Sequence, residues 1–416
     1  MGDEGFPSRE RGLGDTAAAR HRAPTAFMLL YALAYTGLFV AFIPFFSLLL
    51  PVKVEAVSAA DRVALLSRIT LVGALVASVS NIAFGALSDR TYRTRGTRRP
   101  WLLAGLIMLI GAYAIVNLAG DGTALLLGVA VFQIALNAMF APLIAIMADE
   151  VPDDRKGVMA GLLGIAQPVA TLAGVGVTLD FVSGKAAQYA LVCLATAALI
   201  LPLLLFGREG ALPVPPTAQA NGGRFQRRDL ALAWAGKLAI QVAGTAVVTY
   251  FFFYTSDLLR GEANGQARAR TIAWIMAAAT IVAIPLALAC GRISDRIGRR
   301  KPLLAFASAG MVAGLALMAG AGRWEVAAIG YTAFAATYAV FIALHAAFTM
   351  QLLPSPAHRG RDLGFFNLTN TLPNVAGPLL ALLLVGGAST FPILWTAAAI
   401  LCALGGGLLM LVRGQQ

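Results

Sequence analysis

Long apolar runs alternate with short polar connections along almost the whole chain. A helix needs roughly 20 apolar residues to cross the hydrocarbon core of a bilayer. Twelve runs approach that length, so the pattern predicts an all-α protein with twelve transmembrane helices. The first six spans are expected at residues 25–50, 63–87, 101–119, 123–148, 157–180 and 187–207. The second six are expected at residues 230–256, 269–291, 302–320, 325–351, 362–385 and 390–412.

The polar segments divide the chain into two halves with a tail at each end. Residues 25–207 are expected to form an N-terminal six-helix bundle, and residues 230–412 a C-terminal six-helix bundle. Residues 208–229 are polar and contain Pro and Gly, which predicts a cytoplasmic linker. Residues 1–24 lack the apolar core of a signal peptide, so we expect a disordered cytoplasmic tail. Residues 413–416 are expected to form a short cytoplasmic C-terminus.

One basic connection occurs twice. The stretch Gly85–Pro100, GALSDRTYRTRGTRRP, returns in shorter form as Gly291–Pro302, GRISDRIGRRKP. Both copies lie between apolar spans, and both close with a proline at the start of the next span. The matching pairs, all 206 positions apart, are Gly85 and Gly291, Ser88 and Ser294, Asp89 and Asp295, and Arg90 and Arg296. The repeat indicates a duplicated chain that folds as two similar halves.

The duplication extends to the fifth and eleventh spans. The loop Val151–Gly157 resembles the loop Leu353–Arg361, and the spans that follow them contain Pro168 and Pro373. A proline inside a helix removes one backbone hydrogen bond and permits a kink. Membrane helices tolerate this where neighbours cover the freed carbonyl. Two sets of six spans with repeated loops are typical of a transporter whose halves rock against each other.

Composition supports the membrane assignment and excludes other classes. Hydrophobic residues make up 59% of the chain and charged residues 12%, whereas soluble proteins carry about 25% charged residues. The net charge of +12 comes from cations in short connections, so we expect no nucleic-acid partner. The three cysteines form no CxxC pair, and no metal site is predicted. Phosphate-loop and nucleophile motifs are missing from the sequence, so we expect no cofactor and no enzyme activity.

The distribution of Lys and Arg predicts the orientation in the membrane. With the amino terminus inside, 23 of the 32 Lys and Arg residues fall in cytoplasmic segments and eight in outer segments. Positive charge concentrates on the cytoplasmic side of membrane proteins. We therefore expect a multi-pass plasma-membrane protein, acting as a monomer, with both termini in the cytoplasm.

The repeated connection resembles the loop 2–3 signature of the major facilitator superfamily. Its longer form, with Asp89-Arg90-Thr91 and Arg98-Arg99-Pro100, is similar to the glycoside–pentoside–hexuronide cation symporters and the sucrose-type transporters. The resemblance implies the twelve-helix major facilitator fold, with two pseudo-symmetric six-helix halves. It also implies alternating access, in which a central site opens to each side of the membrane in turn.

One departure from that branch concerns the coupling ion. Sodium symporters of the melibiose type carry two aspartates in the second span, where this chain has Ala77 and Asn81. A sodium site usually includes carboxylate oxygens. The resemblance therefore does not extend to sodium coupling of that kind. A proton is a candidate coupling ion, and facilitated diffusion without a coupling ion is the alternative.

The repeated motifs supply candidates for a cytoplasmic gate. In the family, such contacts hold the cytoplasmic side closed and break when the halves rock. The predicted gate residues are Asp89, Arg90, Asp149, Glu150, Asp295 and Arg296, with the acids at 149 and 150 as expected partners of Arg90. The alternative is that these charges only fix topology. That simpler role is expected for the other arginines of the first loop, Arg93, Arg95, Arg98 and Arg99.

Ionisable residues inside the spans are candidates for coupling, because burying a charge in lipid is unfavourable. Lys237 lies in the seventh span and His345 in the tenth. Lys237 is suited to an anionic group of the substrate, or else it reaches the cytoplasmic interface through its long side chain. His345 has the titration range for proton coupling, but a neutral, hydrogen-bonded structural histidine is the competing interpretation.

Neutral polar residues near the middle of the spans are the candidates for the substrate cavity. Sites in transporters of this architecture lie near the bilayer midplane, between the repeats. The cavity candidates are Tyr35, Asn137, Gln167, Gln241, Tyr338, Asn370 and Asn374. Their amides and phenols suit a neutral, polyhydroxylated solute. For each residue alone, the alternative is a hydrogen bond between helices.

An aromatic run, Tyr250–Tyr254, lies near the outer end of the seventh span. It either closes the outer side of the protein or belongs to the aromatic belt at the membrane interface. The sequence does not separate these alternatives.

Together these features predict a secondary transporter that moves a small polar solute, with a sugar or glycoside as the leading candidate. The main alternative is a transporter of the same fold that exports drugs or secondary metabolites. For the protein as predicted here, the expected partners are the solute, the lipid bilayer and, as a candidate, a coupling proton.

Overall fold

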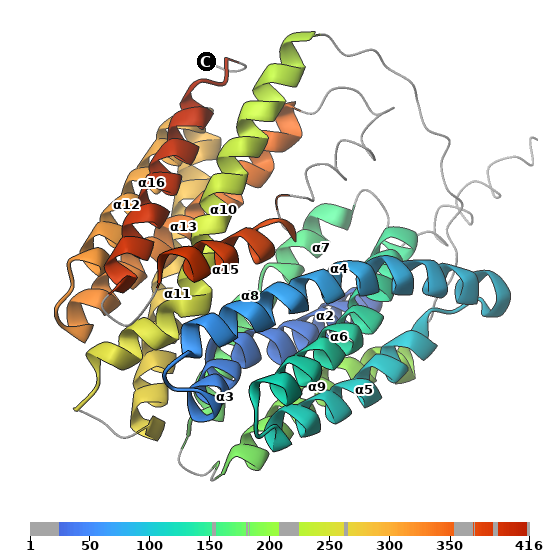
Figure 1. Ribbon diagram of the computed structural model, residues 1–416. Helices are drawn as coiled ribbons and strands as arrows, with labels where there is room; N and C mark the ends of the chain where they lie inside the picture. The colour runs from blue at the N-terminus through green and yellow to red at the C-terminus, as the bar shows by residue number, and fades with distance from the viewer. Residues whose placement is uncertain are drawn as a thin grey trace, which may run out of the picture.

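The computed structural model describes residues 25–151, 155–179, 182, 184–207, 224–261, 265–352, 369, 371–385 and 390–413. Within these ranges, the side chains at 148, 149, 156, 157, 160, 224–227, 295 and 346–352 lie outside the description. The regular structure in the described ranges is helical throughout (Figure 1). The predicted tail at 1–24, most of the predicted linker and the tip at 414–416 lie outside the described residues.

Among the described residues, the first half contains one π-helical segment, η1, and eight α-helices. They are α2 (Thr25–Pro44), η1 (Phe45–Leu49), α3 (Leu50–Val57), α4 (Arg62–Arg95), α5 (Arg99–Leu118), α6 (Gly122–Glu150), α7 (Lys156–Leu163), α8 (Ala166–Val177) and α9 (Lys185–Phe206). The second half contains α10 (Arg224–Leu258), α11 (Gly265–Ile297), α12 (Lys301–Ala319), α13 (Trp324–Leu352), α15 (Pro373–Leu384) and α16 (Phe391–Met410). Helix α10 already begins at Arg224, inside the stretch that the sequence assigns to the linker.

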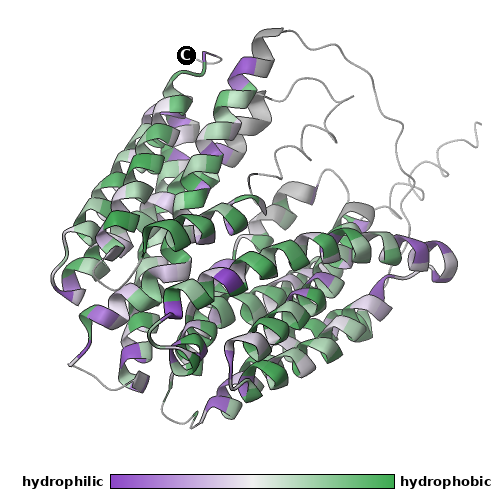
Figure 2. Ribbon diagram, in the orientation of Figure 1, coloured by the Kyte–Doolittle hydropathy of each residue, from purple (hydrophilic) through white to green (hydrophobic). Residues whose placement is uncertain are grey.

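The predicted all-α membrane fold is confirmed. Among the described residues, ten helical stretches are long and apolar enough to cross a membrane, and two shorter apolar helices cover Gly161–Val177 and Pro373–Leu384. The first span is continuous from α2 through η1 to α3. Large apolar side chains such as Val79 and Ile82 point outward with 69% and 75% of their surface exposed. Apolar residues cover much of the outside of both bundles (Figure 2), as a lipid-facing surface requires.

Each half repeats the same packing scheme. In the first half, α6 packs on α4 and α5, and α2 packs on α8 and α9. In the second half, α13 packs on α11 and α12, and α10 packs on α15 and α16. The third and sixth spans also meet in both halves, as α5 with α9 and α12 with α16. The two halves are therefore built by one pattern, in agreement with the duplicated motif.

Glycine permits the closest of these contacts at equivalent places in the two halves. A side chain on Gly105 of α5 would put its Cβ 2.7 Å from the carbonyl oxygen of Ala135 on α6. A side chain on Gly314 of α12 would put its Cβ 2.6 Å from the carbonyl oxygen of Gly330 on α13. Both distances are too short for any residue with a Cβ, so the third and fourth spans approach backbone to backbone.

The fifth and eleventh spans are both interrupted near their prolines. The fifth span turns at residues 164 and 165 between α7 and α8, and Pro168 lies in the first turn of α8. Pro168 has no N–H to bond the carbonyl four residues earlier, at Gly164, so the break falls where that bond is lost. In the eleventh span, α15 begins at Pro373, directly after a turn at Leu372.

The first, second and fifth spans of each half form the contact between the two halves. Helix α4 packs on α15, α8 packs on α11, and η1 packs on α10. Figure 1 shows the first bundle in blue and green and the second in yellow-green to red, side by side along this contact. A central site between the halves would be lined by these helices.

Candidate functional site

The length of α4 gives the molecule two distinct ends. Its 34 residues span about 51 Å at 1.5 Å per residue, well beyond a hydrocarbon core of about 30 Å. We call the end with Arg95 and the repeated motifs the motif end. We call the end with Arg62, where α4 starts, the cluster end.

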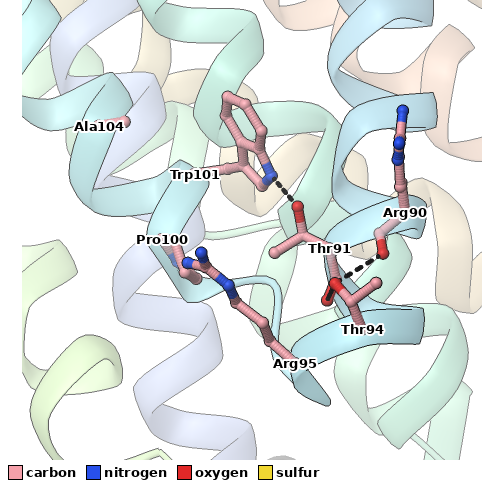
Figure 3. Close-up of a pocket in the computed structure, with 7 residues that line it drawn as sticks. All are labelled: Arg90, Thr91, Thr94, Arg95, Pro100, Trp101 and Ala104. Atoms are coloured by element: carbon pink, nitrogen blue, oxygen red, sulfur yellow. Dashed lines mark hydrogen bonds between the residues drawn. The ribbon is translucent and has the colours of Figure 1, made fainter.

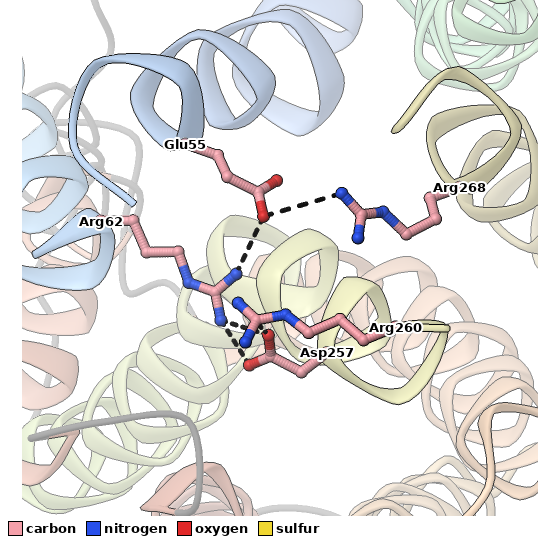
Figure 4. Close-up of polar contacts among 5 residues, drawn as sticks. All are labelled: Glu55, Arg62, Asp257, Arg260 and Arg268. Atoms are coloured by element: carbon pink, nitrogen blue, oxygen red, sulfur yellow. Dashed lines mark hydrogen bonds and ion pairs between the residues drawn. The ribbon is translucent and has the colours of Figure 1, made fainter. Parts of the chain in front are cut away.

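At the cluster end, an arginine from the first half binds an acid from the second half (Figure 4). Arg62 Nη1 donates to Glu55 Oε1 at 3.2 Å, and Arg62 Nη2 donates to both carboxylate oxygens of Asp257. Glu55 ends the first span, whereas Asp257 lies near the end of α10. The Arg62 side chain is only 5% exposed. This ion pair therefore joins the two halves away from water.

Two further arginines complete the group. Arg260 lies 3.0 Å from Asp257, and Arg268 on α11 lies 4.0 Å from Glu55. We call Glu55, Arg62, Asp257, Arg260 and Arg268 the ion cluster. It contains three cations and two anions, and its members come from both halves. Breaking a buried pair by removing one partner leaves an uncompensated charge, so the cluster opposes separation of the halves at this end.

An aromatic layer lies next to the ion cluster. The Arg62 guanidinium lies 5.1 Å from the centre of the Phe253 ring. Tyr250 and Ser67 share a hydrogen bond of 2.6 Å between their hydroxyls, and this is a second link from α10 to α4. All five side chains of Tyr250–Tyr254 are buried, with at most 4% exposed. Because buried side chains cannot face lipid, the aromatic-belt alternative is wrong, and the run packs inside the protein at the cluster end.

At the motif end, the ion pair that the structure describes stays within the first half. Arg98 pairs with Asp89, donates to Ser88 Oγ at 3.1 Å, and lies 4.7 Å from the centre of the Tyr92 ring. The arginine is buried. The expectation that Arg98 only fixes topology was wrong. Gly96 ends α4 with a φ of 67°, and the chain then turns back, which brings Arg98 onto the last turns of the helix.

Two more cations at the motif end bind the ends of neighbouring helices. Arg99, the first residue of α5, donates to the carbonyl of Leu204 near the end of α9 at 3.4 Å. Lys301, the first residue of α12, donates to the carbonyl of Val412 just after α16. Cations are favourable at helix carboxyl ends, where the last carbonyls lack intrahelical partners. Arg99 therefore has a structural role beyond the topology function expected from the sequence, and the same contact occurs in both halves.

The predicted cytoplasmic gate stays a prediction. Asp89 binds Arg98 rather than a residue of the other half, and Arg90 is exposed beside a pocket on the outside of α4 and α5 (Figure 3). Glu150 is buried and Arg296 is exposed. The side chains of Asp149 and Asp295 lie outside the described ones.

The cavity candidates of the first half divide into paired and stacked groups. Asn137 accepts a hydrogen bond of 3.0 Å from Asn81 and donates one of 2.9 Å to the carbonyl of Gln133. Asn81, at one of the positions of the symporter aspartates, therefore forms a neutral amide pair. Tyr35 is half-buried, and its ring centre lies 5.0 Å from that of Phe39 and 6.1 Å from that of Phe140.

In the second half, Gln241 hydrogen-bonds the hydroxyl of Tyr338, which joins α10 to α13. The Tyr338 ring covers Gly244, where a Cβ would lie 2.7 Å from it.

Gln167 on α8 and Asn374 on α15 are exposed, and both helices belong to the contact between the halves. Asn370 lies outside the described residues. The described candidates thus form separate groups in each half, and their role in binding stays a prediction.

The two coupling candidates lie close together at the α10–α13 contact. His345 is fully buried, with its ring 5.3 Å from that of Phe341, and its Nε2 donates to the carbonyl of Ala233 at 3.0 Å. Lys237, one turn further along α10, is half-buried and interacts electrostatically with His345. The hydrogen bond to a backbone carbonyl favours the structural interpretation of His345.

Sequence reasoning did not single out the ion cluster. Arg62, Arg260 and Arg268 are among the eight Lys and Arg residues of the outer segments, and the sequence assigned no partner to them. One signal was present, because the outer connections of both halves carry charges of opposite sign close to the spans. For metal binding, the described residues contain no group of three His, Cys, Asp or Glu side chains that could hold an ion.

Comparison with known proteins identifies the family. The chain matches the Major Facilitator Superfamily over residues 27–266 and again over residues 264–415. No curated protein sequence matches it significantly.

Solved structures share the fold at low sequence identity. A bacterial homologue of the human lysosomal transporter Spinster, in an inward-facing and occupied conformation, is 15% identical, with 94% of this chain and 97% of that chain covered and a TM-score of 0.66. The nucleoside transporter NupG is 13% identical, with 94% and 99% covered and a TM-score of 0.67. The human organic anion transporter MFSD10 is 17% identical, with 92% and 99% covered and a TM-score of 0.59. The repeated helical halves and the two family matches together show that this chain belongs to the Major Facilitator Superfamily of membrane transporters.

Proposed function

We propose that this protein moves a small polar solute across the plasma membrane by alternating access, with residues 25–207 and 230–412 as the two rocking units. The observation that carries the proposal is the ion cluster, in which Arg62 of one half is buried against Asp257 of the other. At the motif end, by contrast, the described ion pair between Asp89 and Arg98 lies within one half. Such an arrangement suits a state that is closed at the cluster end.

The motif end faces the cytoplasm in this proposal, because most of the Lys and Arg residues lie in the connections at that end. Both termini then lie in the cytoplasm. The state described here is then inward-facing, which is also the conformation in which the Spinster homologue was solved. In the outward-facing state, the ion cluster would separate and the cytoplasmic motifs of the two halves would approach each other.

A neutral polyhydroxylated solute, such as a sugar or glycoside, suits the available side chains best. The candidates Tyr35, Gln167, Gln241, Tyr338 and Asn374 offer amides, phenols and aromatic faces without a carboxylate. The resemblance of the first motif to the sucrose-type and glycoside transporters supports the same class. Export of amphiphilic drugs or metabolites is the second candidate, because the exposed cavity candidates on α8 and α15 are uncharged.

A proton is the proposed coupling ion. Asn81, at one of the two positions where sodium symporters of the resembling branch carry aspartates, forms a neutral pair with Asn137. Of the two intramembrane candidates, Lys237 is favoured for coupling, because the His345 ring is hydrogen-bonded to the backbone carbonyl of Ala233.

Solute counterflow in proteoliposomes tests the function. Vesicles preloaded with one unlabelled sugar should accumulate the same radiolabelled sugar, and empty vesicles should not. A proton gradient should drive net accumulation, whereas a sodium gradient should not. Failure of a panel of sugars and glycosides, together with export of amphiphilic dyes, would replace the sugar proposal with the efflux alternative.

A matched pair of variants tests the cavity. Tyr338→Phe removes the hydroxyl that meets Gln241, and it should lower counterflow while the protein stays folded. Tyr254→Phe is the control, because its hydroxyl binds the carbonyl of Met318 within the second half. Equal effects of both variants would remove Tyr338 from the proposed substrate cavity.

A further inference from the structure

A basic pocket lies at the motif end, on the outside of α4 and α5. It has a volume of about 410 Å³, and Figure 3 draws the residues that line it. Arg90 and Arg95 from the last turns of α4 line it, together with Trp101 from the first turn of α5. We propose that this pocket binds the phosphate headgroup of an anionic phospholipid.

The arginines provide the charge. Arg90 and Arg95 are both exposed, and no described carboxylate pairs with either of them. The nearby carboxylate of Asp89 is held by Arg98. Each guanidinium group therefore keeps its charge for an anion from outside the chain, and the two side chains extend in different directions from α4 (Figure 3). A phosphate group accepts several hydrogen bonds from arginine in a favourable planar geometry.

Hydrogen bonds hold the rest of the pocket in shape. The indole Nε1 of Trp101 donates to Thr91 Oγ1 at 2.9 Å, and Thr91 in turn donates to the carbonyl of Leu87 at 2.9 Å. The Trp101 ring also packs edge-on against Phe84, with ring centres 5.4 Å apart. These contacts fix α5 against α4, so the pocket exists before any ligand binds.

The surface below the pocket identifies the source of the phosphate. On α5, Ile107 follows the pocket residues Pro100 and Ala104 at steps of seven and three, and it is 61% exposed; Leu103 and Ile110 lie beside it and are 47% and 54% exposed. Exposed apolar side chains within a span face lipid tails. A pocket with two cations and a tryptophan, placed where such a surface begins, lies at the level of the lipid headgroups.

The chain contains a matched control for the charge. Arg93 is exposed on the same last turns of α4 but does not line the pocket, and its Nε donates to the carbonyl of Asp89. Arg95→Gln and Arg93→Gln therefore remove the same charge from neighbouring positions. Only the first substitution changes the pocket.

Native mass spectrometry of the full-length protein in detergent tests the site. Phosphatidylglycerol and phosphatidylcholine with identical acyl chains are added separately, and the affinity of the first bound lipid is measured. The wild-type protein and Arg93→Gln should prefer phosphatidylglycerol. Arg95→Gln should weaken phosphatidylglycerol binding about fivefold, and leave phosphatidylcholine binding unchanged. Thermal unfolding of the three proteins checks that they are equally folded.

A soluble phosphate distinguishes the two sources of the ligand. Glycerol 3-phosphate should compete poorly, because it lacks acyl chains for the apolar surface of α5. Ile107→Asn should weaken both lipids and leave any binding of glycerol 3-phosphate unchanged. Equal losses for Arg93→Gln and Arg95→Gln, or the absence of a preference for phosphatidylglycerol, would overturn the site. Binding of glycerol 3-phosphate as tight as that of the lipid would assign the pocket to a soluble phosphate ester instead.

Discussion

The two ends of the molecule use buried arginine for different purposes. At the cluster end, Arg62 lies between Glu55 of its own half and Asp257 of the other half. At the motif end, Arg98 is equally buried, and the partners that the structure describes for it, Ser88 and Asp89, belong to its own half. The first arginine resists separation of the halves, and the second stabilises one half as a unit. In a rocking transporter, the first contact must break in each cycle and the second must persist.

The comparison predicts which substitutions change the conformational equilibrium and which change only stability. Both kinds of effect can be measured on the same preparation. Spin-label distances between Ala60 and Gln266 report opening at the cluster end, and distances between Thr94 and Arg292 report the motif end. The three native cysteines are replaced first. Thermal unfolding in detergent reports stability.

The largest effect is expected for Arg62→Ala. It leaves the carboxylates of Glu55 and Asp257 without their shared cation. Loss of one partner from a buried pair costs about 3–5 kcal/mol, and less here because Arg260 and Arg268 stay beside the two acids. Part of this penalty is relieved when the cluster end opens, so the Ala60–Gln266 distance should increase. Arg323→Gln is the control, because Arg323 and Glu325 form an exposed pair within the second half. An unchanged distance distribution for Arg62→Ala would contradict the closing role of the cluster.

The next effect is expected for Arg98→Gln. It removes the charged hydrogen bonds to Ser88 and Asp89, which contribute about 1.5–3 kcal/mol when well shielded, and less here because the Asp89 side chain is 55% exposed. Thermal stability should fall, while both spin-label distances stay the same. A shift in the Thr94–Arg292 distance at unchanged stability would instead support the gating role predicted for Asp89.

A smaller effect is expected for Tyr250→Phe. It removes the hydroxyl that meets Ser67 across the halves, a contribution of about 0.5–1.5 kcal/mol. The cluster end should open in the same direction as in Arg62→Ala, but less often. Tyr254→Phe removes a hydroxyl contact within the second half and serves as the control. If Tyr254→Phe opened the cluster end as much as Tyr250→Phe, the hydroxyl pair would have no special role.

The smallest effect is expected for Arg260→Gln. The Arg260 side chain is 52% exposed, and pairs of this kind contribute about 0–1 kcal/mol. Any opening of the cluster end should be slight and should disappear in high salt, because exposed charges are screened. An effect as large as that of Arg62→Ala would show that burial does not decide which arginine holds the halves together.

The sequence predicted the architecture because its determinants are local. Span length follows from runs of apolar residues, and the duplication follows from Gly85–Pro100 and its second copy at Gly291–Pro302. The fifth span also breaks near Pro168, since a missing N–H acts on its own helix. The partners of individual polar residues were harder to predict. Asn137 was expected in the cavity, and its amide is paired with Asn81 on α4.

What the sequence by itself determined is therefore the all-α membrane fold, its two similar halves and its superfamily. Hydropathy and repeated motifs require no knowledge of the packing. Only the tertiary structure decided that Arg62 meets Asp257, 195 positions away, and that Arg98 returns to Ser88 and Asp89. The sign of a charge and its nearness to a span end are visible in sequence. Its burial and its partner depend on how the two bundles pack and on where the chain turns, and these decide whether an arginine joins the halves or stabilises one of them.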